Sequence, residues 1–162
     1  MMPPFDIHPI IIVGNKWTGV EFFKPNEKWG DPNRMHPWLI YRMDAMRKFA
    51  GRPFHVHCGW EERERISYHS KPMSLAADGH FEGLHPLEQL EVASRFDFGG
   101  IGVYIWWNNP GIHIDVRHVA EPTTPAAHWG SLHSYKSASE TGYVSLNREF
   151  FERAIRSLVT DD

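Results

Sequence analysis

Residues 112–117 constrain the fold of this chain more than any other segment. Isoleucine or valine alternates there with histidine, aspartate and arginine, the period-2 pattern of a β-strand with one apolar and one polar face. The apolar face suits a hydrophobic core. The polar face carries three side chains that suit a metal or anion site: His113, Asp115 and Arg117. An ordinary amphipathic strand with a solvated polar face would show the same pattern.

Patterns elsewhere predict the elements around this strand. The glycine-led segment 99–106 predicts a second strand, and the turn residues 108–111 predict a hairpin that joins it to 112–116. Apolar periodicity and end signals predict helices between Asp31 and Gly51, over 86–93, and after Asn147. On or near its buried face, the last helix is expected to carry Phe150, Phe151, Ile155 and Leu158. Further strands are expected at 53–58 and 75–81, with a solvated loop at 61–65. We expect 122–142 to be irregular.

These elements predict a single-domain α+β fold in which helices flank a small antiparallel sheet. The length of 162 residues is that of one domain. We divide it into an extended arm over 1–30 with a short strand near 10–13, a core over 53–129 and a C-terminal helix within 143–162. The one cysteine, Cys58, excludes an internal disulfide and a multi-thiolate metal site, and we expect it in the core.

Composition excludes several classes of partner. The formal charge of −3, without any run rich in Lys or Arg, argues against nucleic acid. No stretch is long and apolar enough to cross a bilayer. The start lacks the basic leader of a signal peptide, so we expect a cytoplasmic protein or one released by lysis. The sequence does not predict an oligomeric state.

Asp78 gives the polar strand a partner. It follows Leu75-Ala76-Ala77, where a buried carboxylate without a partner would cost several kcal/mol. His69 precedes it by a short loop. Two histidines and one carboxylate, with a fourth position left to water, are the ligands of a catalytic zinc. We therefore expect Zn²⁺ to be held by His69, Asp78 and His113.

Several motifs together resemble a known family. A histidine is followed by Ala-Ala-Asp, a helix, Gly-Gly-Ile-Gly-Val-Tyr and then Gly-Ile-His-Ile-Asp-Val-Arg. This order resembles the zinc D-Ala-D-Ala carboxypeptidases and phage endolysins, whose metal fold the hedgehog signalling domain shares. The resemblance covers 53–129 and is most specific over 103–117. It implies a hedgehog-like fold, zinc bound by the same three residues, and peptide stems of the bacterial cell wall as substrates.

The chain departs from that family at three places. His69 lies nine positions before Asp78 instead of seven, and Lys71 stands at the seventh. The acidic general base of many relatives, three residues before the last histidine, is replaced by Pro110. The Ser-Gly-Tyr-Arg turn is replaced by 58–61, which leaves Arg63 or Arg65 to supply its arginine. The last two departures favour an alternative function, a zinc-binding module without catalysis, such as a virion or wall-binding component. An amidase acting on another small amide is a third interpretation.

Other residues receive roles from their position. Asp115 is either the general base or the acceptor that orients a ligand imidazole. Arg117 binds the substrate carboxylate, an oxyanion or a surface partner. His80 and Glu82 share a strand face with Asp78, so one could be a ligand and the other a base. His55 and His57 are expected to be structural. Two aromatic side chains complete the expected substrate site: Tyr104 and Trp106.

Overall fold

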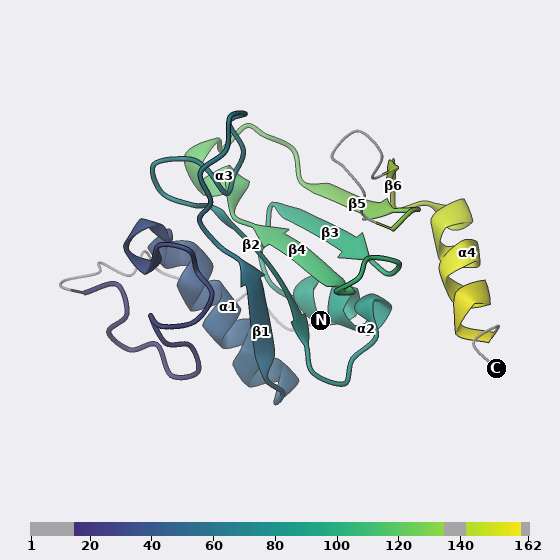
Figure 1. The fold of residues 1–162 in the computed structure, drawn as a ribbon, viewed down its shortest axis with the longest axis horizontal. Coiled ribbons are helices and arrows are strands. Elements are labelled where there is room, and N and C mark those ends of the chain that lie inside the picture. Colours follow the sequence, from purple (N-terminus) through teal and green to yellow (C-terminus); the bar gives the residue numbers. More distant parts are fainter. Residues whose placement is uncertain (1–14, 135–141, 160–162) are drawn as a thin grey trace.

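A computed structural model of the chain describes residues 15–134 and 142–159, and it has an α+β architecture (Figure 1). Its sheet has six strands in the order β1-β2-β4-β3-β5-β6. The strands are β1 (Phe54–Cys58), β2 (Ala76–Phe81), β3 (Gly100–Tyr104), β4 (Gly111–Asp115), β5 (Ala127–Ser131) and β6 (Tyr143–Ser145). The helices are η1 (Pro32–Arg34, a 3₁₀ turn), α1 (Pro37–Ala50), α2 (Pro86–Ala93), α3 (Arg117–Ala120) and α4 (Arg148–Val159).

The α+β class is confirmed, but the sheet is mixed and not purely antiparallel. β3 and β4 form the expected antiparallel hairpin, and β1, β2 and β4 continue the sheet in antiparallel pairs. β5, which lies in the segment predicted to be irregular, pairs in parallel with β3. A parallel partner needs a crossover, and residues 105–126, which include β4 and α3, provide it. The strand expected at 10–13 lies outside the described residues.

The apolar face of the sheet builds the core. Ile112 and Ile114 of β4 are buried with Ile101 of β3. α1 and α2 cover this face, and α1 adds Leu39, Met43 and Met46 to one continuous cluster. Pairing is dense here because each β4 side chain that faces the helices lies between neighbours on both adjacent strands. The opposite face of the sheet is left for polar side chains.

Helix ends and the arm follow from local chemistry. α2 begins at Pro86 after His85, whose side chain accepts a hydrogen bond from Leu87 N–H, while Glu88 closes a reciprocal capping contact. α1 ends at Gly51, which adopts a left-handed conformation with φ of 63°. Within α1, the buried Asp44 carboxylate accepts hydrogen bonds from three backbone N–H groups of the arm, those of Glu21, Phe22 and Phe23. This contact holds the described part of the arm against the domain.

α4 differs from the expected buried helix. It lies beyond the β5–β6 edge of the sheet (Figure 1), and of its side chains only Phe150 and Ala154 are buried. Phe150 packs over Gly130 of β5, where a Cβ atom would collide with its ring. Ile155 and Leu158, expected on or near the buried face, are 55% and 53% exposed. No helix in the described ranges combines the length and apolarity that a membrane span requires.

Candidate metal centre

Backbone pairing aligns the candidate ligands across the polar face of the sheet. Asp78 of β2 lies directly opposite His113 of β4. His113 lies opposite Gly102 of β3, which pairs in turn with Trp129 of β5. Residues paired in this way project from the same face. Gly102 has no side chain, so the Trp129 indole lies over it, 5.1 Å between ring centroids from His113.

His69 reaches this row from the loop between β1 and β2. The loop is held by backbone hydrogen bonds from Glu61 N–H to His69 C=O (3.1 Å) and from Leu75 N–H to Tyr68 C=O (2.8 Å). Lys71, which stands seven positions before Asp78, forms an ion pair with Glu121. The loop thereby turns the His69 ring inward, where it is 4% exposed.

The three predicted ligands converge. His113 Nδ1 lies 2.8 Å from Asp78 Oδ1, His69 Nε2 lies 3.4 Å from Asp78 Oδ2, and the two ring nitrogens are 3.3 Å apart. These four atoms, from three side chains, thus face a common point. Nitrogen and carboxylate oxygen bind zinc at about 2.0–2.2 Å. Three such donors around one zinc ion stand roughly 3–3.5 Å apart at tetrahedral angles, close to the spacing found here.

Outer partners fix which nitrogen of each histidine faces that point. His69 Nδ1 donates to the Gly59 carbonyl at 2.8 Å, which directs Nε2 toward Asp78. His113 Nε2 donates to Asp115 Oδ2 at 3.0 Å, which directs Nδ1 toward Asp78. Metal-binding histidines usually have such an acceptor on the opposite nitrogen, because it sets the tautomer and raises ligand basicity. The donor set therefore fits a cation.

The electrostatics of the metal-free cluster show what a cation would replace. Burial lowers the pKa of His69, but the charge and hydrogen bond of Asp78 outweigh it and raise that pKa to about 9. Burial likewise lowers the pKa of His113, and hydrogen bonds to Asp115 and Asp78 raise it to about 9. Burial raises the pKa of Asp78, yet the two imidazoles hold it far below its ordinary value. Protons on the inward-facing nitrogens thus neutralise Asp78 when no metal is present.

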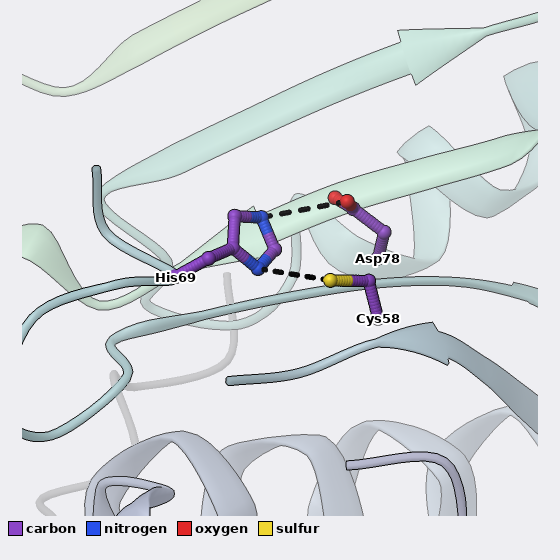
Figure 2. A group of neighbouring side chains, drawn as sticks. All are labelled: Cys58, His69 and Asp78. Atoms are coloured by element: carbon purple, nitrogen blue, oxygen red, sulfur yellow. Dashed lines mark hydrogen bonds and ion pairs between the residues drawn. The ribbon is translucent and has the colours of Figure 1, made fainter. Parts of the chain in front are cut away.

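Cys58 is a member of the site that the sequence did not reveal. A β-bulge between Val56 and Cys58 shifts the register, so that Cys58 pairs with Asp78 and is half-buried. Simple alternation would have placed it on the core face with Phe54 and Val56, so the expectation of a core cysteine was wrong. Its sulfur lies 3.7 Å from His69 Nδ1. Figure 2 shows Cys58 and Asp78 at different nitrogens of the His69 ring.

Two ligand sets therefore share His69 and Asp78. Cys58, His69 and Asp78 each offer one atom within 4.8 Å of the others and could hold a metal ion. His113 offers the other third ligand, with shorter distances to both partners. The set with His113 keeps the hydrogen bond from His69 Nδ1 to the Gly59 carbonyl. Metal binding through His69 Nδ1, the nitrogen nearest Cys58, would break that hydrogen bond.

The contacts of Asp115 favour the orienting role over that of a base. It is fully buried, and Arg117 binds both of its oxygens, with Nε 2.9 Å from Oδ1 and Nη2 2.7 Å from Oδ2. The carboxylate fits over Gly100, where a side chain would collide with it. Hydrogen bonds from Arg117 and His113 outweigh burial and hold the pKa of Asp115 well below its ordinary value. Arg117, which also lies over the Tyr68 ring, is engaged by Asp115.

The cluster opens into a cleft with a volume of about 850 Å³. Of the expected substrate-binding residues, Tyr104, Arg117 and Arg63 line it, whereas Trp106 packs against Phe150 on the far side of β3. Its neighbour Trp107 lines the cleft and stacks on Tyr104, with ring centroids 3.8 Å apart. β3 ends at Tyr104, so strand alternation could not decide between the two tryptophans.

His80 and Glu82 lie outside the cleft. His80 contacts His57 and His55, and Glu82 pairs with His55 at 3.1 Å. Arg63 pairs with Glu61 at 2.6 Å on the cleft wall. The structure thus gathers His69, Asp78, His113 and Asp115 at one centre. His80 and Glu82 lie outside it.

No family model matches the chain, and searches of curated proteins and of solved structures give no significant match.

Replacing Asp115 by Asn tests its orienting role. The amide offers His113 Nε2–H a weaker acceptor and breaks the charged contact with Arg117, so we expect zinc affinity to fall about 10–100-fold. Competition with a chromophoric chelator measures this fall. An unchanged affinity in a folded variant would contradict the role.

The stability of the metal-free protein should depend on pH. Both histidine pKa values rise from 6.5 to about 9, so their ion pairs with Asp78 stabilise the fold fully below pH 6.5 and are lost as pH rises through 9. The depressed pKa of Asp78 adds stability that is complete above pH 3.8 and is lost only as pH falls below that value, so it does not change between pH 6.5 and 9. We expect unfolding free energy in urea with EDTA to fall by more than about 1 kcal/mol from pH 6.5 to 9, since one pKa unit is about 1.4 kcal/mol. The affinity for zinc should instead rise with pH over this range, because zinc binding releases these protons. A flat profile without metal would refute the charge assignment.

Proposed function

We propose that this protein is a zinc-dependent peptidase. One observation carries the proposal: two imidazoles with fixed tautomers and one carboxylate face a common point at the floor of an open cleft. Two histidines and one acid, with room for water or substrate, are the donors of hydrolytic zinc sites. A zinc ion held there would lower the pKa of a bound water to about 7 and polarise a carbonyl.

The cleft walls supply recognition of an extended peptide. Tyr104, Trp107 and Trp129 form an aromatic wall beside the ligands. Arg63 lies on the opposite loop and is the cation best placed to meet a peptide carboxylate, since Asp115 engages Arg117. The family resemblance adds the substrate class, peptide stems of the bacterial cell wall.

Hydrolysis also needs a group that moves the water proton to the leaving amine. Among the described residues, three acids line the cleft: Asp78, Glu61 and Glu62. Asp78 already pairs with His69 and His113. The backbone N–H of Glu61 donates a hydrogen bond to His69 C=O, which fixes Glu61 beside the ligand loop. Its Oε2 lies 3.8 Å from Cys58 Sγ. Glu61 is therefore the candidate for the proton-transfer role, which Pro110 cannot fill. Its ion pair with Arg63 would break when a substrate carboxylate binds Arg63, and this would leave the Glu61 carboxylate free to accept a proton.

A second candidate is a metal-binding module without catalysis. Cys58 favours it, because a thiolate joining His69, Asp78 and His113 would give zinc four protein ligands. Such closed sites are typical of structural zinc. The missing acid at Pro110 agrees with this alternative.

Glu61 and its neighbour provide a matched test of the peptidase. The zinc-loaded protein is incubated with peptidoglycan fragments while free D-Ala and new amino termini are followed. We expect cleavage, a loss of kcat of about 10²–10⁴-fold in Glu61→Gln with zinc content unchanged, and a rate near wild type in Glu62→Gln.

Two results would count against this account. A zinc-loaded wild type that cleaves no peptide fragment would leave the module as the better description. Equal rates in the Glu61 and Glu62 variants would remove Glu61 as the proton-transfer group while leaving the peptidase intact.

A further inference from the structure

Three histidines gather on the polar face of the sheet outside the metal centre. His55 of β1 lies directly opposite His80 of β2, and their ring centroids are 5.1 Å apart. His57, next to the bulge, contacts the same ring, with its Nε2 2.6 Å from His80 Nδ1. The sequence predicted a structural role for His55 and His57, yet none of these rings belongs to the core cluster.

The rings line a hollow of their own. Its volume is about 510 Å³, and Glu27, Lys28 and Asn109 complete its wall. Glu82 lies at its edge, bound to His55 Nε2 at 3.1 Å. Two carboxylates and one ammonium group therefore surround the imidazoles, so the local charge does not repel a cation.

We propose that His57 Nε2 and His80 Nδ1 bind a second divalent cation of the borderline class, Cu²⁺, Ni²⁺ or Zn²⁺, with water completing its coordination. Imidazole nitrogen is a preferred ligand of these ions. The two nitrogens face each other at hydrogen-bond distance, so a cation can take the place of that contact. Metal–nitrogen bonds of about 2.0–2.1 Å require them to separate by less than about 1 Å. His57 is half-buried and His80 partly exposed, so side-chain rotation suffices.

This second site lies next to the first but shares no ligand with it. His57 also lines a smaller hollow, of about 250 Å³, together with Asp78, so the two centres are neighbours on one face. With two protein ligands instead of three, the second site fills after the first. It does not depend on the proposed peptidase activity.

Copper binding in a chain without the first centre tests the proposal. The tag-free variant Cys58→Ser/His69→Gln/Asp78→Asn is titrated with Cu²⁺ and followed by electron paramagnetic resonance. We expect one bound Cu²⁺ with the splitting of two imidazole nitrogens. Adding His57→Ala should weaken binding at least about tenfold, the smallest effect that loss of even an outer partner has. The matched control His128→Ala, an exposed histidine of β5, should leave it unchanged. Absence of Cu²⁺ binding, or equal affinities in the two added variants, would overturn the proposal.

A second measurement covers the case in which the triple variant does not fold. The wild-type chain already loaded with one zinc is titrated with further zinc by calorimetry. We expect a weaker second equivalent that disappears in His57→Ala and in His80→Ala but persists in His128→Ala. A wild-type titration that ends at one equivalent would refute the second site.

Discussion

The pairing of Asp78 with His113 across β2 and β4 is the contact on which the rest of this structure depends. A carboxylate on an inner strand of a six-stranded sheet is costly unless a positive charge lies beside it. His113 meets it from the neighbouring strand and His69 from a loop, and Asp115 and Gly59 hold those rings from behind. Arg117 then neutralises Asp115. The result is a chain of alternating charges, each oriented by the next, that ends at the open cleft.

The sequence predicted those parts of the fold whose signals are local. The alternation of isoleucine with polar residues over 112–116 gave the strand and its faces, and α2 occupies the predicted residues 86–93. β5 was missed because Ala-His-Trp-Gly-Ser has few β-branched residues and gains its strand geometry from parallel pairing with β3. Ile155 and Leu158 were misplaced because periodicity indicates an apolar helix face without showing whether a partner covers it.

The residues of the candidate site could likewise be predicted only where local sequence signals reveal them. Spacing and residue type were enough to select His69, Asp78 and His113. The position of Cys58 depends on a bulge, which strand alternation cannot reveal. The sequence left Asp115 two possible roles, and its burial and its two contacts with Arg117 favour the orienting one. Glu61 was hidden in a charged loop, and only its hydrogen bond to the His69 backbone places it on the cleft wall.

We propose that His113, and not Cys58, completes a zinc site with His69 and Asp78 and leaves one position open. X-ray absorption at the zinc edge of the protein loaded with one equivalent measures this directly. The account predicts a shell of nitrogen and oxygen donors at about 2.0–2.2 Å and no sulfur. A zinc–sulfur distance of about 2.3 Å would contradict it, because it would place the Cys58 thiolate on the metal.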